Sequence, residues 1–198
     1  TLANGKILQL GGTDGRGRGV GAPELYTPGI GWKTLDGANS SAVARDWFYP
    51  RAWLASDGRV VLLQQSSVLV MDASGNGTVQ VVGRTPFAQA DSLPSIMYDV
   101  DKILTLDTRG NAWIMDMSGP VPTFQQTAAL GELRHWSNMT LLADGSVMVS
   151  GGSAVDNSVT RLHNRLEGVT NEVAIWNPGT GEWTRDDEAA LARLYHSS

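Results

Sequence analysis

The chain has 198 residues, with 15 basic and 20 acidic side chains, a formal charge of −5 and no cysteine. Its 41% hydrophobic and 18% charged residues are typical of a globular protein with a buried core. The acidic balance argues against a nucleic-acid surface, and no apolar run approaches the ~18 residues of a membrane span. The lack of cysteine excludes disulfides, thiolate metal ligands and thiol catalysis within these residues.

A short phrase, a turn followed by a β-rich run, returns four times along the chain. Its copies lie at residues 4–12, 57–63, 101–106 and 144–152, and the third is degenerate because Lys102 follows Asp101 in place of a glycine. Asn-Gly or Asp-Gly between two apolar stretches is typical of a β-hairpin, because both residues tolerate the positive φ of a type I′ turn. We therefore expect a strand on either side of each turn.

Further strands complete each repeat. The strands expected before the turns are 51–55, 95–99 and 138–143, and the third strands are 24–26, 68–71, 112–115 and 172–176. Two Pro-Gly turns then lead to a tryptophan on a fourth strand, Trp32 or Trp183. Only residues 186–194 have a locally helical sequence, and their position before a strand favours a loop with one turn.

Four strands per repeat, at a period of roughly 50 residues, predict an all-β fold: a kelch-type β-propeller with about four four-stranded blades. The expected blade cores lie near residues 1–35, 46–82, 92–117 and 133–184, and residues 189–198 begin a further blade. The paired glycines are expected to end the second strand where little room is left, and the fourth-strand tryptophan to pack between blades. A β-sandwich is the alternative, but sandwiches do not repeat a whole phrase at a fixed period.

The order of these phrases resembles the galactose oxidase and glyoxal oxidase family of copper-radical oxidases. The matching stretches are 5–12, 24–32, 51–54, 96–104, 134–146 and 193–197. The resemblance spans almost the whole chain and would cover about four of the seven blades of that family. It implies a secreted or cell-surface oxidoreductase. Such an enzyme oxidises a primary alcohol or an aldehyde with O2, releases H2O2, and uses one copper ion paired with a protein radical.

The most specific matching phrase contains Tyr195 and His196. By the resemblance, Tyr195 is the axial copper ligand and the base that accepts the alcohol proton, and His196 is an equatorial ligand. Phenolate and imidazole suit a tetragonal Cu(II) ion. Adjacent side chains on a regular strand point to opposite faces, so both reach one metal only if the strand ends or bulges there. On residue types alone, an inner blade strand without a metal is the simpler interpretation, and it is the resemblance that adds the copper site as an alternative.

The resemblance also implies two substrate-binding residues. Arg84 takes the place of an arginine that binds sugar hydroxyls in galactose oxidase, and Trp136 takes the place of an aromatic residue on the substrate side. The alternatives are an ordinary exposed cation for Arg84 and a blade-packing aromatic for Trp136. The expected partners are a small-molecule alcohol, aldehyde or carbohydrate, with neither nucleic acid nor membrane.

Departures from the family pattern limit what these residues can do alone. The family's Tyr-Cys cofactor cannot form in a chain without cysteine, and its bridging Tyr would lie just before Thr1. The second copper histidine would lie beyond Ser198, and Asp14 stands where galactose oxidase has a stacking Trp. We therefore expect the isolated chain to be inactive, with its open sheet edges covered by missing propeller segments or by self-association.

The alternative function is a non-catalytic kelch propeller module that binds a carbohydrate or a protein, because one fold carries many functions. Three other features are expected to have no part in catalysis. The glycine-rich run 11–21 lacks the following helix of a phosphate-binding loop, so we expect a flexible connection. His135 is expected to be structural, and His163 to be a solvated loop residue.

Overall fold

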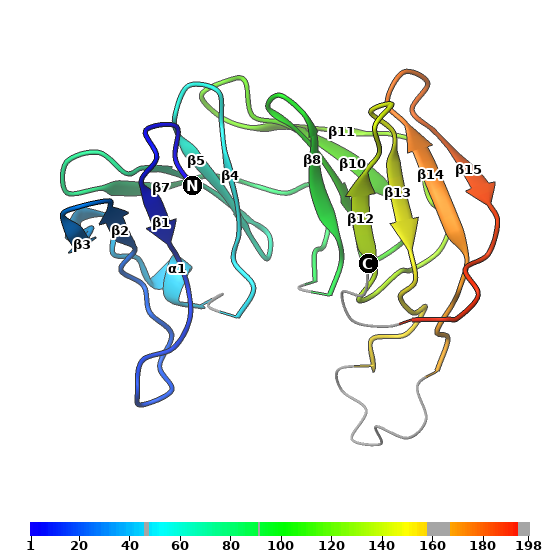
Figure 1. Ribbon diagram of the computed structural model, residues 1–198, viewed down its shortest axis with the longest axis horizontal. Coiled ribbons are helices and arrows are strands. Elements are labelled where there is room, and N and C mark those ends of the chain that lie inside the picture. Colours follow the sequence, from blue (N-terminus) through cyan, green and yellow to red (C-terminus); the bar gives the residue numbers. More distant parts are fainter. Residues whose placement is uncertain (46–47, 91, 158–166, 194–198) are drawn as a thin grey trace. The chain divides into compact units, whose positions relative to one another are not determined.

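The computed structural model describes residues 1–45, 48–90, 92–157 and 167–193. The chain forms two compact units. Unit 1 comprises Thr1–Pro86 together with Met117–Pro122, and unit 2 comprises Phe87–Asp116 and the chain from Thr123 onward. Each unit contains two antiparallel sheets whose strands follow one another in sequence (Figure 1).

Unit 1 begins with a three-stranded sheet in the order β1-β2-β3, followed by a four-stranded sheet in the order β4-β5-β6-β7. The first sheet and the helices after it are β1 (Ile7–Gln9), β2 (Glu24–Thr27), β3 (Gly31–Thr34), the 3-10 helix η1 (Asp36–Ala38) and α1 (Ser41–Arg45). The second sheet consists of β4 (Arg51–Leu54), β5 (Val60–Gln64), β6 (Ser67–Asp72) and β7 (Thr78–Arg84).

Unit 2 contains two four-stranded sheets of the same meander type. The first is formed by β8 (Ser95–Asp99), β9 (Lys102–Leu106), β10 (Ala112–Asp116) and β11 (Thr123–Gln126). The second is formed by β12 (Asn138–Leu141), β13 (Val147–Ser150), β14 (Val173–Asn177) and β15 (Glu182–Asp186).

These sheets confirm the prediction of an all-β protein built from blade-like antiparallel meanders. Residues 186–193, expected to include a helical turn, form no helix. The α-helix of the described ranges is instead α1, which sequence reasoning did not identify, because five residues are too few to show a period of 3.6. No helix in these ranges is long and apolar enough to cross a membrane.

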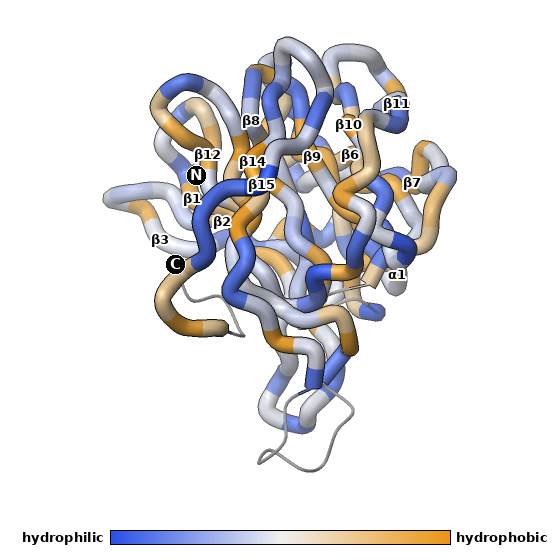
Figure 2. Tube along the Cα trace, turned by 90° about the vertical axis from the view of Figure 1, so that its right-hand side faces the viewer, coloured by the Kyte–Doolittle hydropathy of each residue, from blue (hydrophilic) through white to orange (hydrophobic). Residues whose placement is uncertain are grey.

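The two sheets of each unit pack against each other through their apolar residues. In unit 1, Leu62 and Met71 of one sheet share a core with Leu25 of the other, and in unit 2, Leu104 shares a core with Val149. Orange, hydrophobic stretches accordingly follow strands such as β9 and β14 (Figure 2). Within unit 2 the first strands of the two sheets, β8 and β12, lie side by side, as the inner strands of adjacent propeller blades do.

The fourth-strand tryptophans differ in their surroundings. Trp183 lies on β15, packs against the core between the two sheets of unit 2, and donates from Nε1 to the carbonyl of Ala128 at 2.9 Å. Trp32 lies on β3 as predicted, but it is 55% exposed and contacts the ring of Tyr26. The expected packing between blades therefore holds for Trp183 and not for Trp32.

The hairpin turns are of a different type from the predicted one. Gly58 donates to the carbonyl of Ala55 at 2.9 Å and has φ +89°, whereas Asp57 before it does not have a positive φ. This is a type I turn followed by a left-handed glycine, not a type I′ turn. The Asp57 Oδ1 atom explains the difference, because it accepts the N–H of Arg59 at 3.0 Å and closes the turn from the side chain. The same bonding recurs in the turns at residues 2–6 and 142–146.

Asp107 makes the most buried of these turns, between β9 and β10. Its carboxylate is only 3% exposed and accepts four N–H groups, from the backbone of Arg109 and Asn111 and from the side chains of Asn111 and Trp113, at 2.8–3.0 Å. Burial pushes the pKa of Asp107 up, but the hydrogen bonds from Asn111 and Trp113 and from the two amides outweigh it, so the pKa is lowered. The folded turn therefore favours the charged carboxylate.

We expect Asp107→Asn to destabilise unit 2 by about 1–3 kcal/mol at pH 7, because an amide group turns a donor toward the donors that the carboxylate accepts. Since the folded pKa lies below the unfolded value, the stabilisation is present above about pH 4 and is lost as the pH falls through the folded pKa. The difference in unfolding free energy between the wild type and Asp107→Asn should therefore become smaller in acid. Urea unfolding at pH 7 and pH 3 measures this difference.

Asp144→Asn is the matched control, because the side-chain oxygen of Asn can still accept the backbone N–H and the hydroxyl of Ser146. An equal loss of stability in Asp107→Asn and Asp144→Asn would contradict the account.

Candidate functional site

The structure places two of the four predicted site residues. Arg84 is the last residue of β7 in unit 1; it is exposed, and its Nη1 lies 3.5 Å from Ser66 Oγ. Trp136 lies in unit 2, in the loop before β12, and is buried. Tyr195 and His196 lie outside the described residues, as does His163. The described chain leading toward Tyr195 ends at Arg193.

The segment before Tyr195 is attached to the end of β13. The carbonyl of Arg193 accepts a hydrogen bond from the backbone N–H of Gly152 at 2.9 Å. Upstream, the side-chain amide of Asn171 donates to the carbonyl of Ala189 at 2.9 Å, while the backbone of Ala189 donates to the carbonyl of Asn171 at 2.8 Å. Three backbone or side-chain hydrogen bonds thus hold this segment along the end of the β12–β15 sheet, although it is not a strand.

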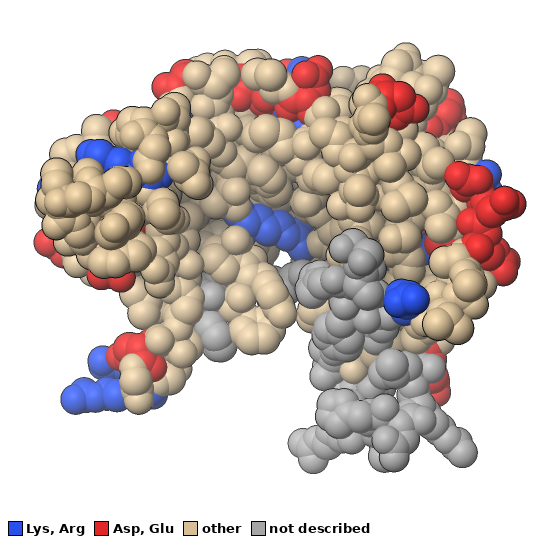
Figure 3. Space-filling view, in the orientation of Figure 1, with Lys and Arg blue, Asp and Glu red and all other residues tan. Residues whose placement is uncertain are grey.

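The same segment covers a cavity of about 310 Å³ on the outer face of this sheet. Met148 and Ser150 of β13 form one wall, and Leu191 and Arg193 form the other. Acidic side chains gather over the adjoining β15 edge of the unit, where Glu182, Asp186 and Asp187 are exposed (Figure 3).

Close approach of three chain segments explains the paired glycines of the phrase at 144–152. A Cβ atom on Gly151 would lie 2.7 Å from the carbonyl oxygen of Arg193. One on Gly152 would lie 2.8 Å from both the carbonyl oxygen of His135 and the Cβ of Ser137. The prediction that little room is left here is confirmed for this pair. It does not extend to Gly12 of the first repeat, where a Cβ would meet nothing within 4 Å.

We expect Gly152→Ala to destabilise the protein clearly more than Gly145→Ala. The two glycines lie in the same sheet unit and have nearly the same φ, +87° and +85°, so the backbone strain of about 1–2 kcal/mol is common to both. Only Gly152 adds a steric clash, since the surroundings of Gly145 are open. Denaturant unfolding of both variants measures the difference, and equal losses would show that the three segments are not in close contact.

Trp136 has an unusual backbone conformation. Its φ is +59°, a left-handed value that a bulky side chain rarely adopts, and the residue is 6% exposed. Two hydrogen bonds hold it there: its backbone N–H donates to the carbonyl of Ser92 at 2.6 Å, and its indole Nε1 donates to Asp156 Oδ1 at 3.0 Å. Strained backbone held by its surroundings is found most often at functional sites. The resemblance implied a place on the substrate side for Trp136 but could not reveal this conformation.

His135, the neighbour of Trp136, has the contacts of a structural histidine. Its Nδ1 lies 2.6 Å from Ser92 Oγ, and its backbone pairs with Ser153 in both directions at 2.8 Å. Burial lowers the pKa of His135, and the charge of Asp156 opposes that shift only in part. The imidazole is therefore neutral at pH 7 and joins the Ser92 loop to the Trp136 loop.

Arg134 is a residue that sequence reasoning missed. Its side chain is 1% exposed, yet every part of the guanidinium is bonded. Nε and Nη2 donate to Glu132, Nη2 also reaches Glu172 at 3.1 Å, and Nη1 donates to the carbonyls of Gly151 and Glu172 at 3.1 and 3.0 Å. Arg185 bonds the same two carboxylates from outside at 50% exposure. Glu172 is 38 residues away from Arg134 in sequence, so no local pattern could indicate this network.

Removal of the buried arginine should cost far more stability than removal of the exposed one. We expect Arg134→Met to destabilise unit 2 by about 3 kcal/mol, because two carbonyls and part of two carboxylates lose their buried donor. Arg185→Met, which removes an exposed arginine from the same carboxylates, should cost about 0.2–1 kcal/mol. Urea unfolding of both variants tests this pair, and a cost for Arg185→Met as large as that of Arg134→Met would contradict the assignment.

The described residues alone do not form a copper centre. No three or more histidine, aspartate or glutamate side chains in these ranges are grouped so that they could hold a metal ion. His135, whose carbonyl lies against Gly152, already uses Nδ1 on Ser92. The candidate site is therefore the Trp136 loop, the glycine pair and the Arg193 segment, and the predicted ligands Tyr195 and His196 follow that segment in sequence.

Comparison with known proteins supports the fold. No protein-family model and no curated protein sequence matches this chain. A solved structure of a fungal alcohol oxidase of the AA5 family, in complex with copper, is similar over 100% of the chain, with a TM-score of 0.81 and 24% sequence identity. The structure of YjhT is similar over 98% of the chain, with a TM-score of 0.71 and 13% identity.

These similarities cover the chain more fully than they cover the other proteins. The chain spans 44% of the length of the fungal alcohol oxidase and 71% of that of YjhT. At these identities the likeness shows a shared fold. Copper binding and alcohol oxidation are therefore properties of the fungal enzyme, and the likeness by itself does not transfer them to this chain.

Proposed function

We propose that this chain is part of the catalytic propeller of a copper-radical oxidase that oxidises primary alcohols or aldehydes with O2. The single observation that carries the proposal is the likeness of the entire chain, at a TM-score of 0.81, to an alcohol oxidase that holds copper. The sequence adds the Tyr195-His196 phrase, which supplies two of the donor types that Cu(II) prefers. The finer resemblance to glyoxal and galactose oxidases is part of the same proposal.

In this proposal Tyr195 and His196 hold the copper ion, and Tyr195 is also the base that takes the proton of the substrate hydroxyl. When bound, copper paired with a protein radical would supply the two-electron redox capacity with which the alcohol is oxidised to an aldehyde and O2 is reduced to H2O2, while Tyr195 would take the hydroxyl proton. The residues that the structure describes contribute by positioning the ligands. The hydrogen bond from the Gly152 N–H to the Arg193 carbonyl fixes the segment that leads to Tyr195 and His196.

Arg84 and Trp136 are the proposed substrate-binding residues. Arg84 is exposed at the end of β7, so its guanidinium is available to hydroxyl groups. The support for Trp136 is its strained backbone and the Asp156 hydrogen bond that fixes the orientation of the indole ring. A mostly buried indole would border the substrate with one edge and exclude water from the rest.

The remaining parts of the copper site are proposed to lie in a longer protein. The 198 residues contain no cysteine for the Tyr-Cys cofactor, so the activity belongs to the whole protein and not to this chain by itself. We also propose an extracellular or cell-surface location, by the same resemblance. Further propeller segments, or a second copy, would cover the open edges of the sheets.

Two measurements on the full-length protein test this function: its copper content, and its release of peroxide when it is given primary alcohols. We expect His196→Ala to lose most of the bound copper, and Tyr195→Phe to lower the rate by about 10²-fold or more, because the general base is removed. His163→Ala is the matched control and should retain both copper and activity. A wild-type protein that binds no copper and forms no peroxide would overturn the proposal and leave the non-catalytic binding module.

A further inference from the structure

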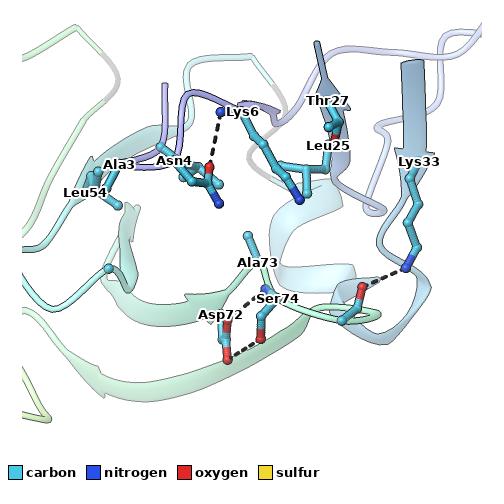
Figure 4. A pocket seen from close by; sticks show the side chains of 13 residues that line it. Ala3, Asn4, Lys6, Leu25, Thr27, Lys33, Leu54, Asp72, Ala73 and Ser74 are labelled. Carbon is cyan, nitrogen blue, oxygen red and sulfur yellow. Dashed lines mark hydrogen bonds between the residues drawn. The ribbon is translucent and has the colours of Figure 1, made fainter. Parts of the chain in front are cut away.

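Unit 1 contains a cavity of about 420 Å³ that no part of the proposed oxidase function uses. It lies where three turns meet the ends of β2 and β3: the turn before β1, the β4–β5 turn and the β6–β7 turn (Figure 4). Its volume is within the range of pockets that hold small molecules.

The floor of the cavity is apolar. Leu25 of β2 and Ala73, which follows β6, are 6% and 9% exposed and belong to the core of unit 1. Leu2 and Leu54 are half-buried beside them and extend the same core toward the opening. A ligand entering here would therefore cover hydrocarbon surface that water now contacts.

The rim of the cavity carries two ammonium groups. Lys6 is half-buried and its side chain extends into the cavity (Figure 4), yet its ammonium makes no hydrogen bond or ion pair with any residue that the structure describes. Lys33 approaches from the opposite wall, where its Nζ donates to the carbonyl of Gly75 at 2.7 Å. That bond uses one of its three N–H groups and holds the side chain at the rim.

One carboxylate, that of Asp72, also lines the cavity, but its own turn engages it. Asp72 Oδ1 accepts the backbone N–H of Ser74 at 2.8 Å, and Oδ2 accepts the hydroxyl of Ser74 at 2.9 Å. Asp72 is not ion-paired with either lysine among the described residues. The rim therefore has an excess of one positive charge, in a chain whose overall charge is −5.

We propose that this cavity binds a small organic carboxylate with an apolar body. The hydrocarbon part would lie on Leu25 and Ala73, and the carboxylate would accept hydrogen bonds from Lys6 and Lys33. An inorganic anion would leave the apolar floor uncovered, and a neutral ligand would leave the Lys6 ammonium without a partner. Charge-assisted hydrogen bonds above an apolar floor are the combination that selects an amphipathic monoanion.

The cavity is separate from the proposed substrate side of unit 1. It lies at the end of β7 that begins with Thr78, which pairs with Asp72, whereas Arg84 ends the same strand. At about 3.3 Å per residue, the two ends of β7 are about 20 Å apart. Carboxylate binding is therefore independent of the oxidase proposal and can succeed or fail without it.

Isothermal titration of the full chain with hexanoate, and with hexanamide as its neutral counterpart, tests the proposal. We expect saturable binding of hexanoate and binding of hexanamide that is about tenfold weaker or more, since the amide cannot form the charge-assisted pair. Lys6→Gln should weaken hexanoate binding by a similar factor and leave hexanamide binding unchanged. Lys33→Gln should weaken hexanoate binding in the same direction.

Arg16→Gln is the matched control, because it makes the same charge change on an exposed side chain in the loop between β1 and β2, outside the cavity. It should leave hexanoate binding unchanged, and the unfolding midpoints of all three variants establish that each is folded. The proposal is overturned if hexanoate shows no saturable binding, if hexanamide binds equally well, or if Arg16→Gln weakens binding as much as Lys6→Gln does.

Discussion

The close contact of three chain segments at Gly151 and Gly152 is the constraint on which the candidate site depends. A single methyl group on either glycine would meet the carbonyl of Arg193 or that of His135 within 2.8 Å. Because no side chain stands there, the end of β13 can touch the loop that carries Trp136 on one side and the segment leading to Tyr195 on the other. The buried guanidinium of Arg134 reinforces the same place by bonding the carbonyl of Gly151.

The meander fold was predictable from sequence because its signals are local. An Asp-Gly pair between apolar runs marks the β4–β5 and β12–β13 hairpins, and the Pro-Gly turns placed Trp32 and Trp183 on the last strands of their sheets. The turn type was not predictable from the dipeptide alone. It depends on whether the Asp side chain bonds the amide two residues later, as Asp57 does with Arg59, and that choice is made by the folded hairpin.

The candidate site was predictable only in part, because its decisive contacts are non-local. The family resemblance singled out Trp136, but its left-handed backbone is held by hydrogen bonds to Ser92 and Asp156, which lie in other loops. Arg134 drew no attention because its partner Glu172 belongs to a different strand connection. The cavity with Lys6 and Lys33 is likewise formed by turns far apart in sequence, and each lysine alone looks like an ordinary surface residue.

The central claim is that this packing delivers the Tyr195-His196 pair to one metal ion. A crystal structure of the copper-loaded full-length protein tests it most directly. The account predicts that the Tyr195 oxygen and a ring nitrogen of His196 both bond the same copper, with the Arg193 carbonyl still on the Gly152 N–H. Side chains of Tyr195 and His196 that diverge on a regular strand, with copper bound elsewhere or not at all, would contradict it.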